Sequence, residues 1–524
     1  MPKPISFGKL DFEIVASMDQ SRGQPDPETP FRVLIMGDFT GRADKGIFDP
    51  HAALAQSRIH LVDRDNLDEI MNKLGVEILL PLTEDMKSSV VLGFAELDDF
   101  HPDRIFEHLA LFKDIGESGK KLSDPSRFAK GASELQEKEG NAASPANTER
   151  TEETLRKSSQ QPPANLLDQI LDDSEGSVSS APSNRVTSEW DSFLKRIAQP
   201  HLVPDVEQVP GEIMTAMDTA TTELMRAILH YPGFQELEAA WRGLHFLVSR
   251  IETDERLKLY LLDISKAELA ADLGSTDDLR KTGTYRLLVE QTIETPGAEP
   301  WALLAGDYTF CDSREDVEML GHLAKIAGAA NAPFIAAADA GLSGCESLAK
   351  TADPGSCKSP EDPEESRAWE TLRKQPEASF IGLALPRFLL RLPYGEKTDQ
   401  IERFEFEEME IKPDHDHYLW GNPSFACAYL LAQSFSEYGR EMKPGMIQEI
   451  EDLPLHIYKE QGESKAKPCA ELLLTEAAAE AILEKGFMPL LSFMNRDTVR
   501  LARFHSIADP PTSLAGRWDR GFNS

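Results

Sequence analysis

The run Trp301-Ala-Leu-Leu-Ala-Gly-Asp-Tyr-Thr-Phe310 decides the fold of the second half of this chain. It begins as an apolar strand, a helical stretch follows at residues 315–330, and residues 333–338 are strand-like again. Further strand-like runs cover residues 257–262 and 380–385. Strands that alternate with helices usually pair in parallel through helical crossovers. The pattern therefore predicts a mixed α/β and α+β fold built on a mainly parallel sheet.

Two amphipathic helices open this block, which we expect to span residues 189–524. Apolar residues recur at helical spacing over residues 213–228 and 234–251, and Pro232 separates the two stripes. Residues 341–370 hold two cysteines and three prolines. That composition predicts a variable surface loop inserted into the block.

Residues 1–115 are expected to form a smaller α/β module. It opens with a stretch in which apolar residues alternate as in a strand. These residues are Ile5, Phe7, Leu10, Phe12 and Ile14. Residues 31–36 form a largely apolar run that ends at Gly37-Asp38, as a buried strand does. Asp65 stands where it could cap a helix that begins near Leu67, and two more strands and a helix follow.

Residues 116–188 are dominated by Ser, Glu, Lys, Asn and Pro, and Phe128 is their only aromatic residue. Such a composition buries too little apolar surface to offset its ordering entropy, which predicts a disordered linker. Residues 165–172 are the exception, because four large aliphatic side chains there share one helical face. They are Leu166, Leu167, Ile170 and Leu171. A helix this short is marginal in water, so it is expected to form when docked on a partner.

The composition excludes some classes of function. The 524 residues carry 55 Lys and Arg against 90 Asp and Glu, a net charge of −35. Such a charge argues against nucleic-acid binding, which needs cationic side chains to replace counterions. The five cysteines have no CxxC spacing, which favours a reduced, cytoplasmic protein. Neither a secretory signal nor a stretch of about 18 apolar residues is present, so we expect no membrane insertion.

Catalytic and metal-binding motifs are weak. The chain has no GxxxxGK[ST] phosphate loop and no GxSxG elbow. Asp38 and Asp307 each follow a glycine at the end of an apolar strand, where an acid could act in catalysis, but a Gly-Asp turn explains both. Residues 414–417 read Asp-His-Asp-His, yet consecutive side chains on an extended chain point to opposite faces and cannot all bind one ion. Cys427 lies in an apolar stretch that favours a buried, inert thiol. We expect no enzyme activity, no metal and no cofactor.

The second block resembles the large contractile-sheath subunit of bacterial type VI secretion systems, the TssC family. The segments that carry this resemblance are Ala227-Ile-Leu-His-Tyr-Pro-Gly-Phe-Gln-Glu-Leu-Glu-Ala-Ala-Trp-Arg-Gly-Leu244, Trp301 to Phe310 as quoted above, Ala332-Pro-Phe-Ile-Ala336, Leu383-Ala-Leu-Pro-Arg-Phe-Leu-Leu-Arg-Leu-Pro-Tyr-Gly395 and Tyr418-Leu-Trp-Gly-Asn-Pro-Ser-Phe-Ala426. The first block is similar to the small sheath subunit, TssB. Its matching segments are Phe31-Arg-Val-Leu-Ile-Met-Gly-Asp-Phe39, Leu61-Val-Asp-Arg-Asp-Asn-Leu-Asp-Glu-Ile70 and Leu97-Asp-Asp-Phe-His-Pro102.

The resemblance implies a contractile-sheath fold in two modules and a structural role. Similar sheaths assemble by self-association around a tube of stacked hexameric rings, stand on a baseplate, contract, and are dismantled by a ring-shaped AAA+ ATPase in the bacterial cytoplasm. The resemblance further implies that Leu166, Leu167, Ile170 and Leu171 form the helix that this ATPase grips. Extended terminal segments link neighbours in such sheaths, so we expect the strand from Ile5 to Ile14 to pair with an adjacent protomer.

Two features depart from the family pattern. The two sheath subunits are normally separate chains, whereas here both lie on one. The large subunit normally continues well beyond the part that resembles residues 489–505, and its further segment contributes to contacts between protomers. A shortened relative that caps or regulates a sheath without polymerising is therefore an alternative. A hydrolase or transferase with its acid at Asp38 or Asp307 is an alternative of a different class.

Overall fold

The computed structural model describes residues 29–46, 54, 58–81, 89–109, 112, 210–343, 363–410 and 413–519. Several predictions from the sequence fall outside these residues. They are the strand from Ile5 to Ile14, the linker at 116–188 with its helix at 165–172, and most of the loop at 341–370.

One large sheet organises the described part of the chain, where nine strands follow the order β11-β15-β14-β8-β7-β6-β1-β5-β2. The six strands from β14 to β5 run parallel, and β15 and β2 pair antiparallel at the two sides of this group. The strands are β1 (Phe31–Gly37), β2 (His60–Val62), β5 (Leu257–Asp263), β6 (Leu303–Phe310), β7 (Phe334–Ala338), β8 (Ile381–Leu385), β11 (Glu449–Ile450), β14 (Met488–Ser492) and β15 (Val499–Leu501). The predicted mixed α/β fold is confirmed.

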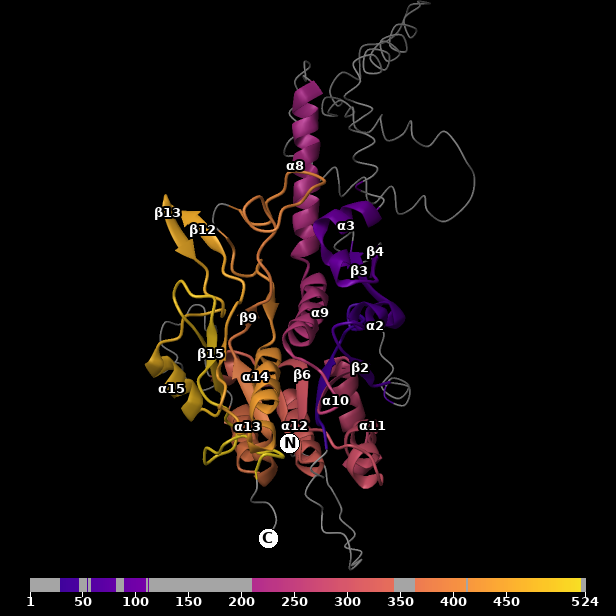
Figure 1. Cartoon of the computed structure of the whole chain (residues 1–524), viewed down its shortest axis with the longest axis vertical. Helices are drawn as coiled ribbons and strands as arrows, with labels where there is room; N and C mark the ends of the chain where they lie inside the picture. The colour runs from indigo at the N-terminus through magenta and orange to yellow at the C-terminus, as the bar shows by residue number, and fades with distance from the viewer. Residues whose placement is uncertain are drawn as a thin grey trace, which may run out of the picture.

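Helices cover both faces of the sheet (Figure 1). Helices α9 and α14 contribute to the apolar core on one face, and α10 and α12 contribute to the core on the other. The helices of the C-terminal part are α8 (Pro210–Leu229), α9 (Pro232–Arg250), α10 (Lys266–Gly274), α11 (Gly283–Tyr285), α12 (Arg314–Ala330), α13 (Pro363–Arg373), α14 (Pro423–Tyr438) and α15 (Glu476–Glu484). Helix α8 extends away from the body of the molecule (Figure 1).

A smaller layer from the N-terminal part lies beside α8 and α9 (Figure 1). It contains α2 (Leu67–Leu74), a hairpin of β3 (Val76–Pro81) and β4 (Ser89–Phe94), the 3-10 turn η1 (Leu97–Phe100) and α3 (Pro102–His108). Strands β1 and β2 of the same part do not belong to this layer, because they lie in the large sheet. The N-terminal part is therefore divided between a layer of its own and the sheet of the C-terminal part.

Short elements complete the described structure. Two small antiparallel pairs join β9 (Phe388–Leu389) to β10 (Trp420–Gly421) and β12 (Ile457–Glu460) to β13 (Glu463–Ala466). A π-helix, η5 (Arg286–Glu294), continues α11. The 3-10 turns are η4 (Leu279–Lys281), η6 (Gly341–Ser343), η8 (Pro376–Phe380) and η9 (Gly439–Glu441).

Candidate functional site, the seam between the two segments

Strand β1 joins the two parts of the chain at the centre of the sheet. We call residues 29–112 the N-terminal segment, residues 210–519 the C-terminal segment, and their contact the seam. Strand β1 pairs along its whole length with β5, and Val33 to Met36 pair with Leu303 to Gly306 of β6. Val33 and Ile35 enter one core, and Leu34 and Met36 enter the other, all without exposed surface. Without β1, the C-terminal segment would lack the strand between β5 and β6.

Aromatic contacts hold both ends of β1. At its start, the Phe31 ring stacks on Phe435 of α14 with centroids 4.7 Å apart. Just beyond its end, the indole N–H of Trp241 donates to the carbonyl oxygen of Phe39 at 2.8 Å. The Phe39 and Trp241 rings also meet edge to face at 5.4 Å. Because Trp241 is fully buried, its N–H needs this acceptor.

The N-terminal layer packs on the start of α9. Phe94 and Phe100 stack at 4.2 Å, and Phe234 meets both rings edge to face. The three rings are buried, so this cluster anchors the layer on the C-terminal segment. Burial of an aromatic side chain of this size stabilises by about 1.5–3 kcal/mol.

A polar clasp joins α3 to the loop around residue 403. The Asp103 carboxylate accepts the backbone N–H groups of Glu402 at 3.1 Å and Arg403 at 3.0 Å. The Arg403 guanidinium pairs with Glu107. Next to the clasp, the rings of Phe106 and Phe404 lie 5.2 Å apart. These contacts link the N-terminal segment to the loop that also contacts α8.

The same loop reaches a buried ionic network beneath α8 and α9. Arg391 pairs with Glu238 at 2.8 Å and with Glu408 at 2.7 Å, and Arg242 pairs with Glu238 at 2.6 Å. Burial alone would raise the pKa of Glu408, but Arg391, His230 and a backbone N–H lower it to about 2. The network is therefore charged and internally paired. Arg226 near the end of α8 donates to the carbonyl oxygen of Glu407, which attaches α8 to this region.

Carboxylates gather where β5 and β1 end, next to Asp307 in the middle of β6. Asp263 accepts the Phe39 N–H at 2.9 Å and pairs with Arg42 at 3.0 Å. Burial raises the pKa of Asp263 to about 6, although Arg42 opposes this shift. Burial, followed by the charges of Glu236 and Asp38, raises the pKa of Asp307 to about 7. We call Asp38, Asp44, Glu236, Asp263 and Asp307 the carboxylate cluster.

The two Gly-Asp pairs of the sequence meet in this cluster. A Cβ atom added to Gly37 would lie 3.0 Å from the Asp307 Cβ, so the close approach of the strands favours glycine there. Asp38 accepts the backbone N–H groups of Arg42 at 3.0 Å and Ala43 at 2.8 Å. This is the role of a turn residue, as one of the two interpretations of Asp38 expected. The same interpretation is wrong for Gly306-Asp307, because both residues lie inside β6 rather than in a turn at its end. Asp307, with a pKa near neutrality, has the protonation behaviour that acid-base chemistry would need.

The four residues 414–417 are directed to different partners. The His415 ring lies 3.0 Å from Glu471 Oε1 and 2.9 Å from Lys467 Nζ, whereas His417 stacks on His230 at 3.8 Å. Among the residues that the structure describes, no group of three or more His, Cys, Asp or Glu side chains could hold a metal ion. Cys427 is fully buried, and burial raises the pKa of its thiol.

The residues proposed from the sequence as binding sites lie outside the described ranges. These are Leu166, Leu167, Ile170 and Leu171 of the short helix, and Ile5, Phe7, Leu10, Phe12 and Ile14 of the first strand. Sequence reasoning missed the ionic network, although Glu238, Arg242 and Arg391 all lie within the segments that carry the family resemblance. Charged residues inside otherwise apolar motifs were the sequence feature that could have indicated this network. Across the described ranges, no helix has the length and apolar character needed to cross a membrane.

Comparisons with known proteins match both segments of the chain. Residues 211–508 match the family described as "EvpB/VC_A0108, tail sheath N-terminal domain". Residues 13–150 match "Type VI secretion system, VipA, VC_A0107 or Hcp2". The type VI secretion system sheath protein TssC1 of Pseudomonas aeruginosa is 38% identical over 308 residues, which are 57% of this chain. The chain spans 61% of the length of that relative. This chain therefore belongs to the tail sheath family of type VI secretion systems, with a VipA-like segment and a large-subunit segment on one polypeptide.

Proposed function

We propose that this chain is a protomer of a contractile sheath that polymerises around an inner tube and contracts to propel it. The observation that carries the proposal is the position of β1, a strand of the VipA-like segment, between β5 and β6 of the large-subunit segment. A sheath built from two subunits needs them in equal number. One polypeptide provides that ratio, because every chain carries one copy of each segment. The contact between the two segments is then intramolecular.

Mechanical work in this proposal comes from rearrangement between protomers and needs no bound nucleotide. Packed interfaces have discrete arrangements, and a switch between two of them can move large bodies. The paired network around Arg391 supports such a role, since it ties α9 and the loop at 402–408 into one rigid unit. The protomer would then move as a body while its contacts with neighbours change.

Electron microscopy of the purified chain without nucleotide tests the proposal. Hollow filaments of sheath width are expected. Short particles that bind only the ends of sheaths formed by other subunits would indicate the capping alternative. Turnover of an ester or nucleotide that Asp307→Asn abolishes, with the fold intact by circular dichroism, would instead support the enzyme alternative.

A separate experiment tests whether the two segments form one protomer. Proteolysis between residues 142 and 147 leaves β1 and β5 on separate fragments. Because β1 is a central strand with both faces buried, the fragments should elute together in gel filtration and separate only in denaturant. Separate elution of folded fragments would contradict the proposal that they act as one protomer.

Contacts between protomers are proposed to use the first strand. Pairing of Ile5 to Ile14 with a neighbouring sheet edge would link protomers into a filament. Deletion of residues 1–20 should then abolish filaments and leave a folded monomer, as measured by sedimentation and circular dichroism. Filaments of normal length after this deletion would show that the strand has no role between protomers.

Further partners are proposed from the family alone. They are inner-tube hexamers, a baseplate and a ring-shaped AAA+ ATPase, all met in the bacterial cytoplasm. The double variant Leu167→Asp with Ile170→Asp should spare assembly and prevent disassembly, so contracted sheaths accumulate in cells. Gln160→Asp with Gln161→Asp adds the same charge outside the helix and is the matched control. Normal turnover of sheaths built from the first variant would refute the assignment of this helix.

A further inference from the structure

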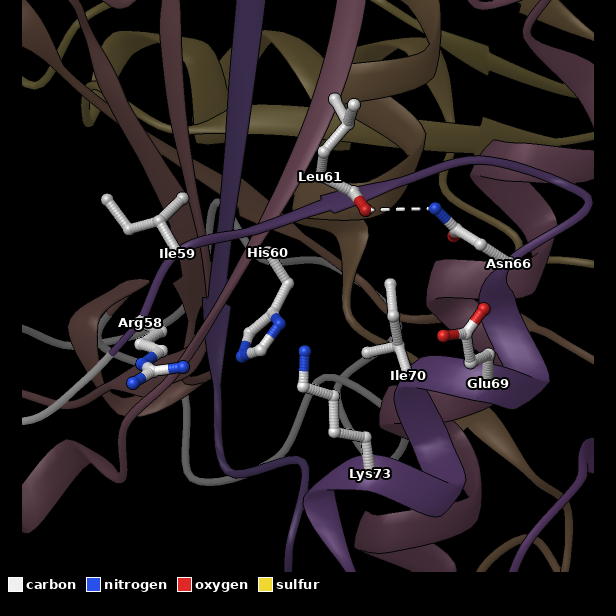
Figure 2. A pocket seen from close by; sticks show the side chains of 8 residues that line it. All are labelled: Arg58, Ile59, His60, Leu61, Asn66, Glu69, Ile70 and Lys73. Atoms are coloured by element: carbon white, nitrogen blue, oxygen red, sulfur yellow. Dashed lines mark hydrogen bonds between the residues drawn. The ribbon is translucent and has the colours of Figure 1, made fainter.

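A pocket of about 330 Å³ lies at the β2 edge of the large sheet. Its lining comes from β2 and the residues before it, and from α2. Figure 2 shows Arg58, His60 and Lys73 with their nitrogen atoms directed into one space between the strand and the helix. The volume suits a single side chain or a small anion, because it is at the lower end of the range for ligand pockets.

Within the part of the chain that the structure describes, the basic groups of this pocket have no acidic partner. Arg58, His60 and Lys73 form no ion pair and no side-chain hydrogen bond with any residue that the structure describes. Glu69 is the acidic residue of the lining, so the pocket has a net charge of +1 with His60 neutral. Burial, followed by the charges of Lys73 and Arg58, lowers the pKa of His60. The lining of the pocket thus carries a net positive charge in a chain of net charge −35.

The strand edge itself is poorly suited to pairing with another strand. Strand β2 has three residues and is the last strand of the sheet. The Asn66 side chain already donates to the carbonyl oxygen of Leu61 at 3.1 Å, which occupies part of the outer edge (Figure 2). What this edge offers to a partner is therefore its charge and the Leu61 side chain, which is 48% exposed and points away from His60.

Charge identifies the partner. Two copies of a chain with net charge −35 repel each other, so close approach of copies requires contacts between locally positive and negative surfaces. We infer that the pocket of Arg58, His60 and Lys73 receives an acidic side chain from a second copy of this chain. This inference rests on the proposed self-association. A free anion would satisfy the basic groups but would leave Leu61 exposed, whereas a second copy can cover both.

Cross-linking of assembled protein tests the contact directly. Equal amounts of 15N-labelled and unlabelled full-length chain are assembled together and treated with a carbodiimide, which joins an amine to a carboxylate in contact. Peptide mass spectrometry should find Lys73 joined to an Asp or Glu in mixed heavy and light pairs. Assembled filaments in which Lys73 forms no such pair would overturn the inference.

Charge reversal provides the second arm. Arg58→Glu with Lys73→Glu should raise the concentration needed for assembly by about tenfold or more, since the attraction of both cations for the incoming carboxylate is lost and replaced by repulsion. Lys374→Glu with Lys397→Glu makes the same change in net charge at exposed lysines elsewhere and should have a much smaller effect. Equal effects of the two double variants would overturn the inference, because overall charge would then explain both.

A third arm separates this inference from the proposed function. If the wild-type chain forms no filaments, the proposed function fails, and the pocket is tested on the unassembled chain. A glutamate hexapeptide should protect Lys73 from acetylation more strongly than inorganic phosphate does at equal ionic strength. Protection by phosphate alone, or by neither probe, would overturn the inference.

Discussion

The ionic network around Arg391 and the carboxylate cluster around Asp307 respond to burial in opposite ways. In the network, two arginines face two glutamates, and the pKa of Glu408 falls to about 2. In the cluster, Arg42 pairs with Asp263, but burial and the charges of Glu236 and Asp38 raise the pKa of Asp307 to about 7. Burial destabilises the ionised form in both places. The difference lies in the number of cations within reach, which decides whether the buried charge is kept or neutralised.

Removal of Arg391 should have the largest effect. Arg391→Ala removes the cation that Glu238 and Glu408 share and leaves both carboxylates buried. We expect the free energy of unfolding, measured in urea, to fall by about 3–5 kcal/mol. The exposed pair of Lys374 and Glu370 offers a control, and Lys374→Ala should cost less than about 0.5 kcal/mol. Equal stabilities of the two variants would mean that solvent screens the Arg391 network.

A smaller effect of opposite sign is expected at Asp307. Its pKa is about 7 in the folded chain, whereas the ordinary value for an aspartate is 3.8. Between about pH 4 and pH 7, Asp307 therefore keeps its proton in the folded state and loses it in the unfolded state. The contribution of Asp307 to stability is fully present below pH 4 and is lost as the pH rises through 7. Asp307→Asn removes this loss and should stabilise the chain at pH 8 by about 1–2 kcal/mol. This value is smaller than the pKa difference alone would give, because the side chain keeps some contact with solvent, which screens its charge.

The pH dependence provides the control for this prediction. The advantage of Asp307→Asn over wild type should shrink as the pH falls from 8 to 5, because wild-type Asp307 then becomes neutral in the folded state. Urea unfolding at several pH values measures it. An advantage independent of pH would show that the substitution acts through packing, and destabilisation at pH 8 would contradict the raised pKa.

The smallest effect is expected at the edge of the carboxylate cluster. The Tyr231 hydroxyl donates to Asp44 Oδ1 at 2.8 Å, and burial together with Asp44 raises the pKa of Tyr231 to about 12. Tyr231→Phe removes this donor from an acid whose other oxygen is buried without a hydrogen bond. We expect a cost of about 0.5–1.5 kcal/mol in urea unfolding, constant from pH 6 to 9. No change in stability would mean that water replaces the hydroxyl.

Local pattern predicted the elements of the sheet well. The apolar runs at 257–262, 301–305, 333–338 and 380–385 correspond to β5, β6, β7 and β8, because strands buried on both faces are continuously apolar. The cap of α2 was less predictable. Asp65 was expected to cap this helix, but Asn66 occupies the N-cap position, and Asp63 accepts the N–H groups of Asp65 and Asn66. Several acidic and amide side chains in a row compete for the same backbone donors, so sequence alone does not choose among them.

The ionic groups were the least predictable part of the candidate site. Glu238 and Arg391 are separated by more than 150 residues. Nothing in their own neighbourhoods indicates that they meet, and a charged residue within an amphipathic helix is normally expected at the surface. Asp38 and Asp307 were both noticed at the ends of apolar strands, but their proximity depends on β1 lying next to β6.

By itself, the sequence determined the element types, the alternation of strands and helices, the charge of −35 and the family motifs, because these depend on residues close together in the chain. Only the tertiary structure decided that β1 enters the sheet between β5 and β6. Apolar strands carry little information about which neighbour they choose, since many pairings would bury the same side chains. That one pairing brings the two Gly-Asp pairs together and makes β1 of the N-terminal segment a structural part of the sheet.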